Sequence, residues 1–119
     1  MMTPVIFVAF GGALGAVLRY LVGSVLAFPM GTLAVNVAGS FAIGLVWVSL
    51  AARGLQGWAP FVMTGVLGGF TTFSAFSLDT LRLVEAGRIM AAGGYVLASV
   101  VLSIAACGLG LWLAKGMTT

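Results

Sequence analysis

Four long apolar stretches, separated by short turns, dominate the chain. They cover residues 4–26, 32–52, 58–81 and 89–114, and each is close to the length of about 20 apolar residues that a helix needs to cross a bilayer. The turns between them contain glycine or proline, which commonly end helices. This pattern predicts an all-α integral membrane protein with four transmembrane helices, organised as a single domain over residues 1–119.

The third apolar stretch has a polar interruption near its middle. Residues 65–76 read Gly-Val-Leu-Gly-Gly-Phe-Thr-Thr-Phe-Ser-Ala-Phe, and the pair Gly68 and Gly69 allows unusual backbone dihedrals. Non-helical backbone at membrane depth is tolerated only where protein buries it or water reaches it. We therefore expect the third helix to be broken in mid-membrane at Gly68–Thr72.

A break of this kind indicates transport rather than catalysis, because broken helices form ion sites in membrane transport proteins. Carbonyl groups that lose their helical partners can coordinate a hard cation such as Na⁺. The N-terminus of the half-helix that follows suits an anion, since its amide hydrogens are unpaired.

Composition excludes several functional classes. Only 6% of the residues are charged, against about a quarter in a soluble domain. Histidine is absent, and the two acids, Asp79 and Glu85, flank the expected polar loop between the third and fourth spans. Enzymatic function has no support, and a dispersed net charge of +3 does not suggest nucleic-acid binding.

Positive charges are nearly balanced between the two faces of the expected bundle. Arg53 and Lys115 lie on the face with both termini, and Arg82 and Arg88 on the other. Arg19 could snorkel to that second face. Because orientation in the membrane depends on such a bias, we expect insertion in both orientations and an antiparallel homodimer; the alternative is that a weak bias fixes one orientation.

Several polar residues within the apolar stretches are candidates for a permeation pathway. Asn36 is costly at its depth unless it is hydrogen-bonded, so it marks either a pathway or a contact between helices. Tyr95, Ser99 and Ser103 recur every four residues and share one helical face. Their hydroxyls either line a wet path or bond to carbonyls of their own helix.

Aromatic, basic and small residues complete the candidate set. Phe73 and Phe76 share a face after the break, where they either pack or present positive ring edges to an anion. Arg19 is either an anchor at the interface or a charge that collects anions at a vestibule. Small residues four apart predict close helix packing; the two clearest pairs are Gly11 with Gly15 and Gly65 with Gly69.

Three motifs resemble the Fluc (CrcB) fluoride channels of bacteria and archaea. They are the run Gly-Gly-Phe-Thr-Thr-Phe-Ser-Ala-Phe at 68–76, Gly-Thr-Leu-x-Val-Asn-x-x-Gly at 31–39, and Gly-x-x-Gly-Ala-x-x-Arg-Tyr at 12–20. The similarity covers nearly the whole chain, in the expected order.

This resemblance implies an antiparallel, dual-topology homodimer with two narrow fluoride pores. It implies a structural Na⁺ at the dimer interface, held by main-chain carbonyls of Gly68 and Thr71. It also places Arg19 near the vestibule. The pore residues that it implies are Asn36, Thr72, Phe73, Ser74, Phe76, Tyr95, Ser99 and Ser103.

The implied activity is passive, electrogenic fluoride efflux across the cytoplasmic (inner) membrane of a prokaryote, which reduces fluoride toxicity. One residue departs from the family pattern, since Ala75 stands where related sequences often have Thr. One hydroxyl of the polar track is therefore missing. In addition, Asp79 stands where related sequences frequently carry Glu.

Two other functions remain open from the residues. A small multidrug exporter also has four spans, but it needs a carboxylate deep in the membrane, and the first two spans contain none. A non-transporting assembly subunit would explain the glycine packing but not the polar break.

Overall fold

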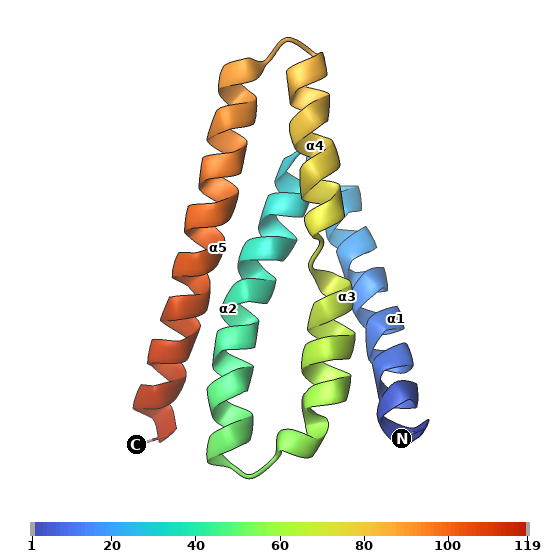
Figure 1. Ribbon diagram of the computed structural model, residues 1–119, viewed down its shortest axis with the longest axis vertical. Helices are drawn as coiled ribbons and strands as arrows, with labels where there is room; N and C mark the ends of the chain where they lie inside the picture. Colours follow the sequence, from blue (N-terminus) through green and yellow to red (C-terminus); the bar gives the residue numbers. More distant parts are fainter. Residues whose placement is uncertain (1, 119) are drawn as a thin grey trace.

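The computed structural model describes residues 2–118, in which four spans lie side by side with both termini at the same end (Figure 1). Each span is helical, long and apolar enough to cross a membrane. They are α1 (Met2–Val25), α2 (Met30–Ala52), a third span over Gln56–Glu85, and α5 (Ile89–Thr118). The prediction of an all-α protein with four membrane-spanning helices is confirmed.

The third span consists of several segments rather than one regular helix. In chain order they are the 3₁₀ turn η1 (Gln56–Trp58), the π-helix η2 (Pro60–Leu67), α3 (Gly68–Phe70) and α4 (Phe73–Glu85). Between α3 and α4 the backbone is extended, with φ −90° and ψ 159° at Thr71 and φ −155° and ψ 115° at Thr72.

This extended segment is shorter than the interruption expected at Gly68–Thr72. Gly68 and Gly69 are helical, and Gly68 has φ −63° and ψ −37°, so these two glycines do not supply unusual dihedrals. Their expected place in the interruption is therefore wrong. The position of the extended residues at mid-membrane depth stays a prediction.

Glycines bring α1 into backbone contact with η2 and α3, as the small-residue spacing predicts. A Cβ on Gly11 would clash with the carbonyl oxygen of Phe61, and one on Gly65 would lie 2.9 Å from Cα of Gly11. A Cβ on Gly15 would clash with the carbonyl oxygen of Val66. Small residues permit this approach because nothing projects between the helices.

The upper half of the third span has a different neighbour. While η2 and α3 pack on α1, α4 packs on α5, and α4 and α5 lie side by side beneath the turn that joins them (Figure 1). A buried cluster at this contact contains Phe76, Leu83, Ala92 and Tyr95. The extended residues thus stand where the third span exchanges α1 for α5 as its packing partner.

Candidate functional site

A cavity of about 420 Å³ lies among α2, the third span and α5. The residues that line it are Asn36, Gly39, Ser40, Ile43, Met63, Leu67, Gly68, Thr71, Thr72, Phe73, Phe76, Ser99, Val100, Ser103 and Ile104. The structure therefore brings most of the expected pore and cation residues together at one cavity. In the described part of the chain, this lining includes hydroxyl, amide and aromatic groups but no charged side chain.

Asn36 pairs with the main chain of Thr72 at the centre of this site. The Thr72 amide donates to Oδ1 of Asn36 at 2.8 Å, and Nδ2 of Asn36 donates to the Thr72 carbonyl at 3.0 Å. A side-chain amide can replace a neighbouring peptide in this way because it offers one donor and one acceptor side by side. Asn36 thus satisfies both polar groups of an extended residue, which answers the question of how its burial is compensated.

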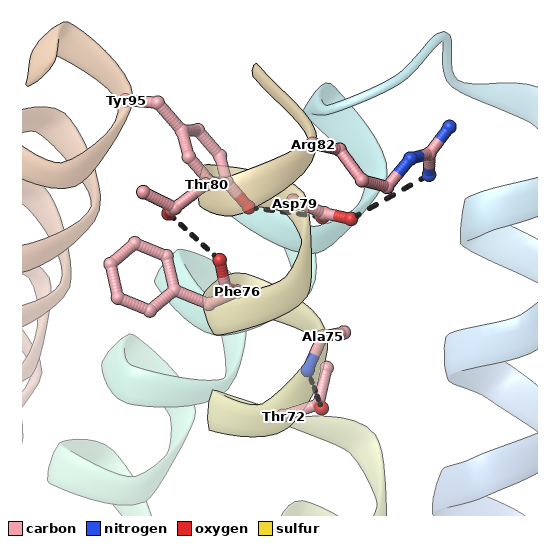
Figure 2. A network of polar contacts seen from close by, with 7 residues as sticks. All are labelled: Thr72, Ala75, Phe76, Asp79, Thr80, Arg82 and Tyr95. Carbon is pink, nitrogen blue, oxygen red and sulfur yellow. Dashed lines mark hydrogen bonds and ion pairs between the residues drawn. The ribbon is translucent and has the colours of Figure 1, made fainter. Parts of the chain in front are cut away.

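The same pair removes a helical hydrogen bond from Gly68. In a continuous helix the amide of residue 72 would donate to the carbonyl of residue 68, but here it donates to Asn36. The side chain of Thr72 removes a second helical hydrogen bond, because its Oγ1 accepts the amide of Ala75 at 3.0 Å (Figure 2). That amide would otherwise serve the carbonyl of Thr71.

Two carbonyls, those of Gly68 and Thr71, therefore lose their regular helical donors, and both residues line the cavity. Carbonyl oxygens are suitable ligands for a hard cation. The donor set fits the Na⁺ site that the family resemblance implies for these residues, although its occupation by Na⁺ stays a prediction.

Arg19 contacts the same segment from the opposite helix. Its Nε donates to the carbonyl of Gly69 at 3.0 Å, and the side chain is half-buried. Arg19 also lines a smaller cavity of about 150 Å³ together with residues of α1, α2 and the start of α4, including Thr72 and Ala75. Arg19 is therefore held inside the protein, and Thr72 contributes to both cavities.

Three aromatic rings contact one another in sequence, in tilted arrangements, and two of them line the large cavity. The ring centroids of Phe73 and Phe76 are 5.3 Å apart, and those of Phe76 and Tyr95 are 5.4 Å apart. Phe73 is 77% exposed, whereas Phe76 and Tyr95 are buried. Phe76 packs between its two neighbours, but Phe73 lies at the cavity with most of its surface exposed.

Tyr95 lies behind Phe76 and contacts an acidic residue. Its hydroxyl donates to Oδ2 of Asp79 at 3.2 Å, and the other carboxylate oxygen lies 4.0 Å from Arg82 (Figure 2). Asp79 is only 7% exposed and belongs to α4. The expectation that Asp79 flanks the loop is wrong, because α4 continues to Glu85 and carries Asp79 on its face toward α5.

The serines of α5 and the break differ in their bonding. Ser99 is buried, lines the cavity, and its Oγ has no hydrogen-bond partner among the described residues. Ser103 lines the same cavity, whereas Ser74 is exposed and pairs with the Thr72 hydroxyl at 3.2 Å. By contrast, Ser77 bonds to a carbonyl of its own helix. Ser99 therefore does not follow the alternative in which such hydroxyls bond back to their own helix.

Sequence reasoning missed part of the α2 contribution to the cavity. Gly39, Ser40 and Ile43 line it together with Asn36. These positions follow Asn36 at three, four and seven residues, which is the spacing of one helical face. This spacing from Asn36 could have identified them, but an apolar helix gives little indication of which of its faces lines a cavity.

Comparison with known proteins gives a consistent result. The family described as "CrcB-like protein, Camphor Resistance (CrcB)" matches residues 6–111. A protein of Paracoccus denitrificans named "Fluoride-specific ion channel FluC" is 57% identical over 116 residues, which cover 92% of this chain and 93% of that protein. A protein of the same name from Roseobacter denitrificans is 52% identical over 98% of both chains. A third, from a Ruegeria species, is 50% identical over the full length of both.

Proposed function

Because the chain belongs to the CrcB family of fluoride channels, we propose that it conducts fluoride selectively and passively across the membrane. A member of a channel family is not an enzyme, and four apolar spans make the chain a multi-pass membrane protein. The observation that carries the proposal is the cavity in which Asn36, Phe76 and Ser99 meet.

The pore that we propose follows this cavity. Fluoride is small and strongly hydrated, so a pathway must replace its water with donors that hold it weakly enough for release. Asn36 uses one Nδ2 hydrogen on Thr72, and its amide nitrogen carries a second. The unpaired hydroxyl of Ser99, the hydroxyls of Thr72, Ser74 and Ser103, and the ring edges of Phe73 and Phe76 would supply further weak contacts.

We further propose an antiparallel dual-topology homodimer with two such pores. The near balance of positive charge between the two faces supports both orientations. The 77% exposure of Phe73 beside the cavity supports a second protomer that covers this ring. In this proposal, Tyr95 contributes to the pore mainly by packing behind Phe76.

The dimer would contain a structural Na⁺ held by the carbonyls of Gly68 and Thr71 from each protomer. The loss of their helical donors to Asn36 and Thr72 supports this assignment. A bound cation would take the place of the hydrogen-bond donors that these two carbonyl oxygens have lost. Arg19 would stand at the vestibule, where it lines the smaller cavity.

Such a channel would protect a prokaryotic cell from fluoride at its inner membrane. Fluoride that enters as neutral HF dissociates inside the cell, where the anion is trapped. A membrane potential that is negative inside drives each anion outward with about 2.3 kcal/mol per 100 mV. The channel therefore needs no pump to reduce fluoride toxicity.

Fluoride efflux from liposomes that contain the purified protein tests this function. Valinomycin carries compensating K⁺, and chloride-loaded liposomes serve as the control. We expect rapid, electrogenic fluoride release with negligible chloride release. No fluoride release from folded, dimeric protein would overturn the proposal and would direct attention to proton-coupled cation transport, for which the buried carboxylate of Asp79 is the available group.

A further inference from the structure

Among residues 2–118, Arg19 is the basic residue that bonds directly to the segment around the extended residues. It lies 50 positions before Gly69, and its Nε donates to the Gly69 carbonyl at 3.0 Å. In a continuous helix that carbonyl would accept the amide of residue 73, but the extended backbone of Thr71 and Thr72 interrupts the helix before that residue. Arg19 therefore replaces a helical donor that the chain geometry has removed.

Neighbouring carbonyls at the end of α3 differ in their hydrogen-bond donors. The Leu67 carbonyl accepts both the amide and the hydroxyl of Thr71, each at 3.1 Å, and the Gly69 carbonyl accepts Arg19. The carbonyls of Gly68 and Thr71 lose their donors to side-chain oxygens, as described above. The carbonyls of Leu67 and Gly69 are thus bonded within the protein, whereas those of Gly68 and Thr71, two residues that line the cavity, have lost their helical donors.

The glycine packing explains why Arg19 reaches Gly69 and not its neighbour. A Cβ on Gly69 would lie 2.6 Å from the carbonyl oxygen of Gly12 and 3.2 Å from the amide of Ala16, both on α1. Gly68, in contrast, lines the large cavity. One residue therefore points toward α1 and the other toward the cavity, and Arg19 holds the first of the two.

The positive charge of Arg19 would repel a cation bound nearby, so the contacts of Arg19 must explain its presence beside the proposed site. Within residues 2–118, the ion pair present joins Arg82 and Asp79, and no carboxylate compensates Arg19. The carbonyl dipoles at the C-terminal end of the helical stretch formed by η2 and α3 do so in part, because a cation is favourable at a helix C-terminus. The contact with Gly69 is thus both a hydrogen bond and a charge–dipole interaction.

We propose that Arg19 is a positioning residue for the cation site. By occupying the Gly69 carbonyl, it fixes the backbone at the end of α3 and the extended residue that follows, so that the carbonyls of Gly68 and Thr71 stay free to bind the cation. This inference rests on the sodium site of the proposed function. It assigns to Arg19 a role that depends on a donor at Nε rather than on collecting anions.

Three substitutions separate the donor from the charge. Arg19→Gln places an amide nitrogen on Cδ, which is the position of Nε in arginine, and removes the charge. Arg19→Met places a methyl group at the same position, with neither donor nor charge. Arg19→Lys keeps the charge but places a methylene at the Nε position. Arg53→Met, at an exposed turn, is the matched control for loss of a positive charge.

Two measurements read these variants. The first is the Na⁺ concentration that gives half-maximal thermal stabilisation of the purified protein, with K⁺ as the reference salt. The second is hydrogen–deuterium exchange of the amides in residues 68–76. We expect Arg19→Met and Arg19→Lys to need about tenfold more Na⁺, as expected for loss of one charge-assisted hydrogen bond, and to exchange faster in this segment. Arg53→Met should match the wild-type protein, and Arg19→Gln, which keeps the donor but loses the charge, should lie between the wild-type protein and Arg19→Met.

The outcomes are distinct from those of the function test. Equal behaviour of Arg19→Gln and Arg19→Met, or wild-type Na⁺ dependence in Arg19→Met, would overturn the positioning role. A wild-type protein that conducts fluoride but does not respond to Na⁺ would overturn the sodium site together with this inference, while the fluoride channel itself would stand. If Arg19→Met fails to fold, the comparison of Arg19→Gln with Arg19→Lys decides between donor and charge.

Discussion

The two halves of the third span use opposite modes of packing. Below the extended residues, η2 and α3 meet α1 backbone to backbone, through glycines on both sides. Above them, α4 meets α5 through large side chains, including Phe76, Leu83 and Tyr95. In one continuous helix the glycine face and the face with large side chains would have a fixed relative orientation. The extended residues Thr71 and Thr72 allow the two halves to be oriented separately toward α1 and α5. The polar site lies where the two modes meet.

This comparison explains why so much polar chemistry collects at one place. Here the change of packing partner coincides with a gap in the helical hydrogen bonds, and each freed group in an apolar environment needs a new partner. Asn36 from α2 and Arg19 from α1 supply donors or acceptors to this gap. The groups that they leave unpaired are then available to an ion.

The largest expected effect comes from breaking the glycine half. Gly15→Ala would place a methyl group against the carbonyl of Val66 and 2.8 Å from the amide of Phe70, and backbone atoms cannot move aside as a flexible side chain can. We expect a loss of about 3 kcal/mol or more in stability, at the upper end for overpacking, together with loss of fluoride flux. Thermal unfolding in detergent and liposome flux measure both.

Gly12→Ala is the control on the same helix, because its Cβ would find only the Gly65 carbonyl oxygen, at 4.0 Å. It should fold and conduct as the wild-type protein does. Equal stability of the Gly15 and Gly12 variants would contradict the backbone-contact description of this half.

The next effect concerns the junction itself. Asn36→Leu has a similar size but leaves both main-chain groups of Thr72 without partners, at a cost of about 1–3 kcal/mol for each buried unsatisfied group. Because the variant also removes the Nδ2 donor from the proposed pore, we expect fluoride flux to fall by at least about tenfold, equivalent to about 1.4 kcal/mol of lost ion stabilisation, while the proposed dimer still assembles. Flux assays combined with size-exclusion chromatography test this; wild-type flux in the folded variant would remove Asn36 from the proposed pore.

A smaller effect is expected in the side-chain half. Tyr95→Phe keeps the ring that stacks on Phe76 but removes the hydroxyl that donates to Asp79. We expect a loss of about 1.5 kcal/mol in stability, the lower value for a hydrogen bond to a charged group, and only a modest change in flux. Tyr20→Phe, at a residue that is 74% exposed, should leave both unchanged. A loss of flux without a loss of stability would instead place the Tyr95 hydroxyl in the ion path.

The smallest effect on stability is expected at Ser99. Its buried hydroxyl has no partner among the described residues, so Ser99→Ala should leave stability unchanged or raise it by about 1 kcal/mol, the cost of an unsatisfied polar group. Fluoride flux should nevertheless fall, though less than in Asn36→Leu, because Ser99 lines the cavity of the proposed pathway. Ser24→Ala, at an exposed position on α1, is the control. Unchanged flux in Ser99→Ala would show that this hydroxyl is dispensable.

The sequence alone determined the membrane-spanning architecture, because hydrophobicity and turn signals act locally along the chain. Four apolar stretches predicted four spans, and small residues four apart predicted close helix packing, which the structure shows between α1 and the third span. Polar residues isolated in apolar stretches, such as Asn36 and Ser99, also identified themselves as candidates, since such residues are costly without a specific role.

Only the tertiary structure decided how these residues are used. The non-helical segment narrowed to Thr71 and Thr72, Asp79 turned out to be buried on α4, and Arg19 found the Gly69 carbonyl. Each outcome depends on a partner that lies 16 to 50 positions away in sequence. Local preferences cannot identify such partners, because which backbone group is freed depends on which helix packs against each half of the third span.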